Sequence, residues 1–288
     1  MEQIGINGIT QRHTWPRYKE DIVRVILEAL TMLREREDLI ADEVDLNRKL
    51  FFCFKRAAHK LRLSHHLPVP EGKNPPYEDD EQRAARENKR PDFYWQFCDA
   101  SVDDPKWCDR RFVLECKRLG KPRSSTPNWI LTRNYIQHGI TRFLSGEHEY
   151  AKGDDSGAMI GYVENMEFDV ILSEVNTYMA SSTVPISPLS IPAKGWQKDG
   201  ISALEHTLIR TFPISPFLLL HFWIDFREHN LLLPEPKNKN TYAEEVFREV
   251  NSSKIKARTS DKRTLKERKH GKSLESSSQL SLPIDYTH

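Results

Sequence analysis

The sequence predicts an α/β protein in which a central mixed β-sheet is flanked by helices. Two observations favour this class: helical apolar spacing fills the first sixty residues, and apolar runs typical of strands then alternate with helical segments as far as about residue 226. A third observation, the loss of apolar pattern after about residue 234, predicts a polar C-terminal tail. At 288 residues, the chain can form one large domain with appendages.

Two amphipathic helices are expected first. Residues 16–41 carry an apolar stripe, formed by Ile22, Val25, Ile26, Ala29, Leu30 and Leu33. Residues 43–62 carry a second stripe, formed by Leu46, Leu50, Phe54, Ala57 and Leu61. The following segment, 64–90, has four prolines and many charges, which predicts an exposed loop.

A β-hairpin is expected next. The runs "DFYWQFCDA" (92–100) and "RFVLECK" (111–117) are rich in aromatic and β-branched residues, and the segment between them contains the Asp and Pro of a turn. The pattern then predicts a helix within 129–145, a buried strand over 157–163 and another helix over 164–180. Two final strands are expected within 206–226.

These elements predict three regions. Residues 1–42 form an N-terminal helical extension, 43–233 form the α/β domain, and 234–288 form a charged helix and flexible tail. Within the tail, residues 252–272 hold nine basic residues against two acidic ones. Disorder is the default for such a segment, and contact with nucleic acid or a protein partner is the alternative.

The charge distribution is more informative than the net charge of +1. Residues 106–133 hold eight basic residues against two acidic ones, although the first 230 residues are mildly acidic overall, with 31 Lys and Arg against 34 Asp and Glu. A solvated loop face explains such a cluster, and so does a surface that binds phosphates.

Several classes of function are disfavoured. No apolar run is long enough to span a bilayer, and the polar N-terminus lacks a signal-peptide core, so we expect a cytoplasmic protein without membrane contact. The four cysteines show no CxxC spacing and are expected to be reduced thiols; a zinc site using Cys98, Cys108 and His65 or His66 is the alternative. There is no P-loop, HExxH or GxSxG motif, and a His221–Asp225 pair is interpreted as structural.

The expected hairpin places unusual charges in its strands. Side chains alternate along a strand, so Glu115 and Lys117 share one face with Val113. If Asp92 opens the antiparallel partner strand, its carboxylate lies near Glu115, and two adjacent carboxylates favour a hard cation such as Mg²⁺ between them. The backbone carbonyl of Cys116 could add a ligand, and Lys117 could orient a water molecule or stabilise a phosphodiester under attack. The structural alternative is an ion pair at a sheet edge, between Glu115 and Lys117 or Arg118.

The pattern "RPD" followed after 22 residues by "ECK" resembles the PD-(D/E)xK nuclease superfamily over roughly residues 43–226. The resemblance implies a restriction-endonuclease-like fold in which Asp92 and Glu115 hold Mg²⁺, or Mn²⁺ in its place, and Lys117 assists the attacking water. Many members add a glutamate from the preceding helix. Glu43 is the best match, with Asp42 and Asp45 as neighbours and Asp45 a candidate helix N-cap.

The resemblance extends to the helix after the lysine strand. Members often carry a polar pair there, which implies a catalytic role for Gln137 and a phosphate contact for Arg142. Arg118, Lys121 and Arg123 of the basic stretch are expected to bind phosphates. One departure is evident, because the family core begins with a strand that 63–90 does not clearly supply.

The combined expectation is a Mg²⁺-dependent nuclease that acts on DNA in preference to RNA. The segment "HGITRFLSGEHEYAKGDDSGAMIGYV" resembles members that defend cells against phages and other foreign DNA, which implies a role in antiviral defence. The alternative is an inactive nuclease-like scaffold that binds nucleic acid or a partner subunit. Because the chain has no motor motif, either function would fit a complex with a separate ATPase or helicase.

Overall fold

The computed structural model describes residues 14–74, 85, 87–99, 102–103, 108–121, 130–211, 214–229 and 231–232. The chain divides into two units, Met1–Pro234 and Glu235–His288, and the described residues all lie in the first. The expected C-terminal helix and tail therefore lie outside the described residues, as does Arg123. Within the described ranges, no helix is both long and apolar enough to cross a membrane.

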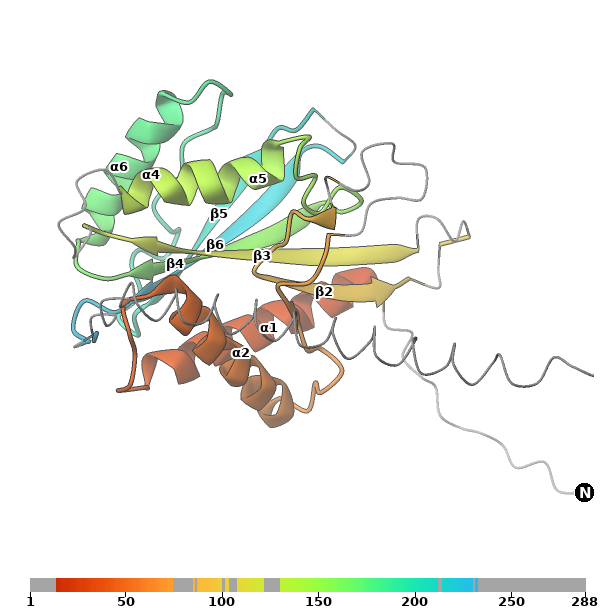
Figure 1. The fold of residues 1–288 in the computed structure, drawn as a ribbon, viewed down its shortest axis with the longest axis horizontal. Helices are drawn as coiled ribbons and strands as arrows, with labels where there is room; N and C mark the ends of the chain where they lie inside the picture. Colours follow the sequence, from red (N-terminus) through yellow and green to blue (C-terminus); the bar gives the residue numbers. More distant parts are fainter. Residues whose placement is uncertain are drawn as a thin grey trace, which may run out of the picture. The chain divides into compact units, whose positions relative to one another are not determined.

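The described part is an α/β fold with one six-stranded mixed sheet between two helical layers (Figure 1). The strand order is β1-β2-β3-β4-β6-β5. The β1–β2, β2–β3 and β5–β6 pairs are antiparallel, whereas β3–β4 and β4–β6 are parallel. The strands are β1 (Val69–Pro70), β2 (Phe93–Cys98), β3 (Asp109–Leu119), β4 (Ser156–Val163), β5 (Ile201–Leu208) and β6 (Phe217–Asp225).

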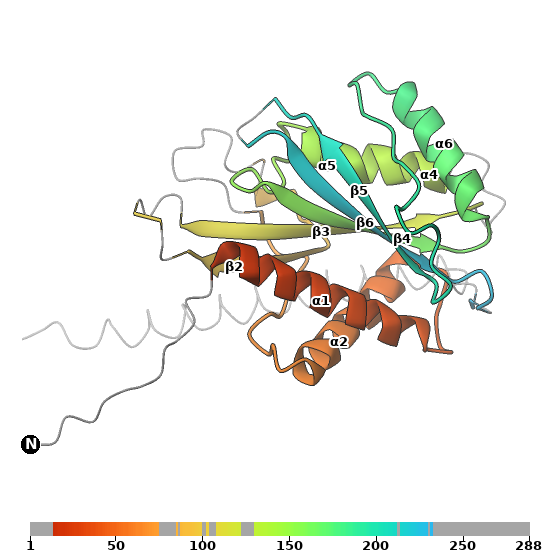
Figure 2. The same cartoon turned by 180° about the vertical axis from the view of Figure 1, so that it is seen from behind.

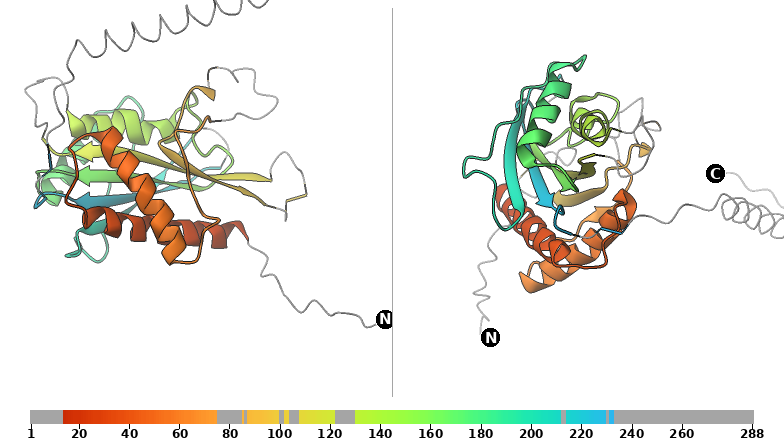
Figure 3. Two further views of the ribbon diagram at one scale, coloured as in Figure 1. Left: turned by 60° about the horizontal axis from the view of Figure 1, so that its bottom comes forward. Right: turned by 90° about the vertical axis from the view of Figure 1, so that its left-hand side faces the viewer.

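Each face of the sheet is covered by helices, as the views from opposite sides show (Figures 1 and 2). One layer holds α1 (Trp15–Arg34) and α2 (Glu43–Lys60); the other holds α6 (Phe168–Ala180) and a helix of three joined pieces. Those pieces are α4 (Leu131–Tyr135), the π-helical turn η2 (Ile136–Ile140) and α5 (Thr141–Leu144). The end view in Figure 3 (right) shows the sheet between these layers.

Side-chain alternation along β3 separates the two cores. Leu114 and Cys116 belong to the apolar cluster on the α1 and α2 side, whereas Val113 and Leu119 belong to the cluster beneath α4, η2, α5 and α6. Glu115 and Lys117 share the face of Val113 and Leu119, as predicted, because residues two apart point the same way. Both are nearly or fully inaccessible to solvent, so this strand carries charges into the interior.

The predicted elements are largely present, with three differences. The segment expected to be all loop contains β1, a strand of two residues that pairs with β2 and is too short to give a periodic pattern. The strand expected near His206 begins earlier, at Ile201, because Ser202 and His206 occupy inward positions normally taken by apolar residues. The first helix ends at Arg34, before the predicted 41. It packs within the same compact unit as the sheet.

Candidate active site

The N-terminus of α2 supplies the first acidic group of the site. Asp42 is the N-cap, because its carboxylate accepts hydrogen bonds from the backbone N–H groups of Val44 and Asp45 at 3.0 and 3.1 Å. Asp45, a candidate N-cap from the sequence, does not cap the helix; its carboxylate pairs with Lys49 at 2.9 Å. Glu43, the first helical residue, is then free to extend toward the sheet.

Asp92 immediately precedes β2 and is fixed across the hairpin. Its Oδ2 accepts a hydrogen bond of 2.7 Å from the backbone N–H of Cys116. Its own carbonyl accepts one from the N–H of Glu71 at 3.0 Å. The carboxylate is therefore held beside the part of β3 that carries Glu115 and Lys117.

Three acidic residues predicted from the sequence converge on the ammonium group of a fourth predicted residue, Lys117. Lys117 Nζ lies 2.8 Å from Glu43 Oε1, 3.4 Å from Glu115 Oε2 and 3.6 Å from Asp92 Oδ2. It also donates to the carbonyl of Cys116 at 2.7 Å. We call Glu43, Asp92, Glu115 and Lys117 the Lys117 cluster.

Burial and mutual repulsion set the charge state of the Lys117 cluster. Burial, followed by the charge of Asp92, raises the pKa of Glu115 to about 8. Burial also raises the pKa of Glu43, which the nearby ammonium partly offsets. For Lys117, burial acts to lower the pKa, but the three carboxylates together outweigh it and the net pKa is raised. The lysine is therefore protonated, and Glu115 is the acid that most easily holds a proton.

A second cation reaches the Lys117 cluster from the helix above it. Arg142 Nη1 in α5 donates to Glu115 Oε2 at 2.8 Å. The same helix contains the π-helical turn, in which Gly139 lies directly over the sheet. A Cβ at this position would collide with Met159 Cε and lie 3.5 Å from Lys117 Cγ, so an added methyl group would require the buried Met159 side chain to move. Single π-helical turns often occur at functional sites.

Gln137 does not join the cluster. Its side chain is exposed, and only its backbone carbonyl makes a described hydrogen bond, with the Thr141 hydroxyl at 2.7 Å. The next residue, His138, lies close enough to the site for the charges of Arg142 and Lys117 to affect its imidazole. Burial, followed by the charges of Arg142 and Lys117, lowers its pKa. The imidazole is therefore neutral at neutral pH.

Tyr150 is a further neighbour that the sequence did not indicate. Burial, followed by the charge of Glu115, raises the pKa of its hydroxyl, so Tyr150 is a neutral proton donor beside the acid. It lies in the turn between α5 and β4, outside any periodic pattern. No sequence signal distinguishes it from other buried tyrosines.

The structure leaves few of the expected phosphate ligands available. Arg118 is held in an ion pair with buried Glu164, with Nη2 and Oε2 3.1 Å apart, and Arg142 is engaged by Glu115. Lys121 is exposed, and its described hydrogen bonds are made by its backbone: the N–H donates to Asn165 Oδ1 at 2.8 Å, and the carbonyl accepts from Asn165 Nδ2 at 2.9 Å. Of the expected set, Lys121 is the described residue that remains open to a ligand.

The structure also bears on two other sequence interpretations, an edge-strand ion pair at Glu115 and a structural His221–Asp225 pair. β3 lies between β2 and β4, so the Glu115–Lys117 contact is internal and cannot be an edge-strand ion pair. His221 Nδ1 lies 2.6 Å from the Tyr135 hydroxyl, whereas Asp225 pairs with Arg227 at 2.8 Å. His221 and Asp225 therefore do not form a site with each other.

The carboxylate oxygens of the Lys117 cluster are the type of ligand that a hard cation prefers. With Glu115 protonated, two carboxylates face two cations, Lys117 and Arg142, and loss of the Glu115 proton would leave one negative charge in excess. Glu115 Oε1 is buried and meets no donor with hydrogen-bond geometry among the described residues. In the present arrangement the ammonium lies among the carboxylates, and no three described Asp, Glu, His or Cys side chains are grouped to hold a metal, including the cysteines considered for zinc. Lys117 would have to move aside for a cation to bind.

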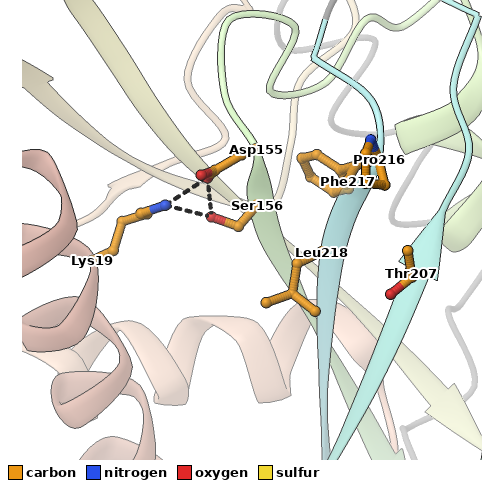
Figure 4. A pocket seen from close by; sticks show the side chains of 7 residues that line it. All are labelled: Lys19, Asp155, Ser156, Thr207, Pro216, Phe217 and Leu218. Atoms are coloured by element: carbon orange, nitrogen blue, oxygen red, sulfur yellow. Dashed lines mark hydrogen bonds and ion pairs between the residues drawn. The ribbon is translucent and has the colours of Figure 1, made fainter.

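A separate pocket of about 280 Å³ opens at the other end of β4 and β6 (Figure 4). Lys19 projects toward it, but its ammonium already contacts Asp155 Oδ1 at 2.5 Å and Ser156 Oγ at 3.1 Å. Phe217 and Leu218 line much of the remainder. Because its charges are paired with each other, this pocket is a weaker candidate than the Lys117 cluster.

Comparison with protein-family models, with curated proteins and with solved structures gives no match. A function for this protein must therefore be inferred from the geometry of the site.

Proposed function

We propose that the protein is a metal-dependent nuclease that hydrolyses phosphodiester bonds, with the Lys117 cluster as its active site. The observation that carries this proposal is the convergence of three acids and a lysine from α2, the start of β2 and the middle of β3. Two of these residues, Glu43 and Lys117, are separated by 74 positions in the chain yet contact at 2.8 Å. Helical or strand periodicity alone would not bring them together.

The strand order supports the same proposal. A helix (α2) precedes three antiparallel strands, β1, β2 and β3, and a helix then leads to β4, which is parallel to β3. This is the arrangement expected of a restriction-endonuclease-like core, with the acids on its second and third strands. In this proposal, the short β1 would correspond to the first strand of such a core, which was not evident in the sequence.

The residues of the cluster have distinct proposed roles. Asp92, Glu115 and the Cys116 carbonyl would hold Mg²⁺ or Mn²⁺, which when bound would supply Lewis-acid stabilisation of the phosphate and a more acidic water. Glu43 and Lys117 would orient the attacking water, and the Lys117 ammonium would stabilise negative charge that develops on the phosphate. Arg142 fixes Glu115 through their 2.8 Å contact and thereby positions the acid.

In this proposal, the protein cleaves DNA in preference to RNA and acts in the cytoplasm in defence against foreign DNA.

The test is to incubate the purified chain with plasmid, linear duplex, single-stranded DNA and RNA, in Mg²⁺, Mn²⁺ or chelator. Cleavage of at least one DNA form is expected with metal and not with chelator, and Lys117→Ala should reduce its rate at least a hundredfold. Lys194→Ala, at an exposed position far along the chain, is the control. Equal cleavage by wild type and Lys117→Ala would refute the assignment.

One observation favours a second candidate, a nuclease-like scaffold that binds nucleic acid or a partner subunit without cutting. The Lys117 ammonium already neutralises the carboxylates that a cation would otherwise occupy. Binding that survives chelation, with no cleavage by the chain alone or reconstituted with a partner ATPase, would support the scaffold.

A further inference from the structure

The solvent-facing side of α2 carries a short row of basic and aromatic side chains. Phe52 follows Arg48 by four residues, and Lys55 and Arg56 follow Phe52 by three and four. The four side chains therefore lie on one face of the helix. We call these four residues the α2 stripe. All four are exposed, and Figure 3 (left) shows α2 in front of the sheet in a view onto this layer.

Phe52 is the unusual member of the stripe. It is 50% exposed, and it is the sole aromatic among the exposed large apolar side chains of the described ranges. Its ring lies beside that of Phe51, with centroids 6.2 Å apart, and Phe51 in turn stacks on Phe93 of β2. Lys55 Nζ lies 4.4 Å from the Phe51 ring and 5.7 Å from the Phe52 ring. An exposed ring next to a cation is suited to stacking a base while the cation binds a phosphate.

The cations of the α2 stripe are available, unlike those of the basic stretch on β3. Lys55 and Arg56 make no ion pair with any residue that the structure describes. The Arg48 side chain is 65% exposed, and its guanidinium reaches Asp45 only at 3.8 Å. By contrast, Arg118 and Arg142 are committed to buried glutamates. Compared with these two paired arginines, the cations of the α2 stripe are therefore better able to attract a polyanion.

The stripe lies on the same helix as Glu43 of the candidate active site, but on the opposite face of that helix. Glu43, at the first position of α2, contacts Lys117, and Phe52 follows nine residues later. At a rise of about 1.5 Å per residue, this separates the two by roughly 14 Å along the helix axis, or about four backbone steps of a nucleic-acid strand at about 3.4 Å each. Nine residues also make two and a half helical turns, so Phe52 points away from Glu43, and a strand would have to pass around the end of α2 to reach both.

We propose that the α2 stripe binds an unpaired segment of a nucleic-acid strand, with a base stacked on Phe52 and phosphates at Arg48, Lys55 and Arg56. An unpaired strand is specified because the ring can stack only on a base that is not covered by its neighbours in a duplex. The proposal builds on the nuclease function, since it assigns the outer face of α2, away from the Lys117 cluster, to holding the substrate. The binding itself requires no metal and no cleavage.

The test measures binding in chelator, so that catalysis plays no part. Fluorescently labelled dT₂₀, rU₂₀ and a blunt duplex of equal length are titrated with the full-length chain and followed by anisotropy. Phe52→Ala should weaken binding of the single strands about tenfold and that of the duplex less than twofold. Lys55→Gln/Arg56→Gln should lower the slope of log affinity against log salt by about 0.7 for each phosphate that is no longer neutralised. The dT₂₀ and rU₂₀ arms distinguish DNA from RNA.

Two matched controls lie away from the stripe. Ile209→Ala removes a side chain that is 74% exposed, and Lys194→Gln/Lys198→Gln removes two exposed charges near the β5 edge; neither should change affinity. Unchanged melting temperatures would show that each variant folds. Equal single-strand affinity for wild type and Phe52→Ala, equal losses for single strand and duplex, or no binding by wild type would each overturn the proposal. Binding through the stripe with no cleavage under any metal condition would uphold it and refute the nuclease function alone.

Discussion

Among single side chains, Glu115 should show the clearest response to pH. Its folded pKa of about 8 exceeds its usual value near 4.5, so between these values the folded state binds a proton that the unfolded state has lost. Stability contributed by the protonated acid is therefore lost as pH rises through this window. Without metal, we expect the free energy of unfolding to fall by on the order of a few kcal/mol from pH 5 to pH 8.

Urea denaturation at pH 5, 6.5 and 8, in chelator, tests this expectation. Glu115→Gln is the matched control, because it keeps the shape of the side chain but cannot ionise, and its pH dependence should be much flatter. The assignment would fail if both proteins lost the same free energy over the window.

Glu43 and its neighbour Asp45 form a natural pair for mutation. Both are acids in the first turn of α2, but Glu43 contacts Lys117 whereas Asp45 pairs with Lys49. Glu43→Gln should slow metal-dependent cleavage about 10- to 100-fold, the effect typical of groups that support a metal site. Asp45→Asn should cut at the wild-type rate. A larger loss in Asp45→Asn than in Glu43→Gln would contradict the role given to Glu43.

The helix formed by α4, η2 and α5 depends on one glycine for its close approach to the sheet. Gly139→Ala places a methyl group against Met159 and Lys117, so it should destabilise the fold by about 1–3 kcal/mol and reduce activity. Gly146→Ala is the control, because no atom lies within 4 Å of a Cβ at that position. Thermal melts compare the two variants, and Met159→Ala should restore part of the loss in Gly139→Ala. Equal melting temperatures for both glycine variants would contradict the packing argument.

Among the elements, α2 shows how a local choice positions a functional group. Three acids occur within residues 42–45, and the sequence alone could not decide which one reaches the site. The decision follows from the cap: once Asp42 binds the first backbone N–H groups, helical geometry directs Glu43 to the sheet and Asp45 to Lys49. If a different acid had capped the helix, a different side chain would have pointed toward the sheet.

At the scale of the molecule, the division at Pro234 predicts an independent folding unit. A protein truncated to residues 1–234 should keep the main thermal transition of the full chain within about 2 °C and cleave short oligonucleotides at the same rate. Differential scanning calorimetry and the nuclease assay measure these two properties. A transition lowered by 10 °C or more would show that the second unit contributes to folding of the first.

Much of this molecule could be predicted because its local patterns are strong. The α/β class and the hairpin followed from apolar periodicity, and strand alternation placed Glu115 and Lys117 on one face. Features that depend on distant partners could not be predicted in this way. Arg118 was expected to bind phosphate, but its partner Glu164 lies 46 residues further along the chain. Tyr150 enters the site from a turn, and the β1 strand has only two residues, so neither leaves a periodic signal.

The central claim is that the Lys117 cluster performs metal-dependent hydrolysis of phosphodiester bonds. Single-turnover cleavage of a labelled DNA substrate by wild type and Glu115→Gln, measured over a range of Mg²⁺ concentrations, tests it most directly. We predict that wild-type cleavage rises with Mg²⁺ to saturation and that Glu115→Gln is at least a hundredfold slower at every concentration. Equal rates for the two proteins, or wild-type cleavage that persists in chelator, would contradict the account.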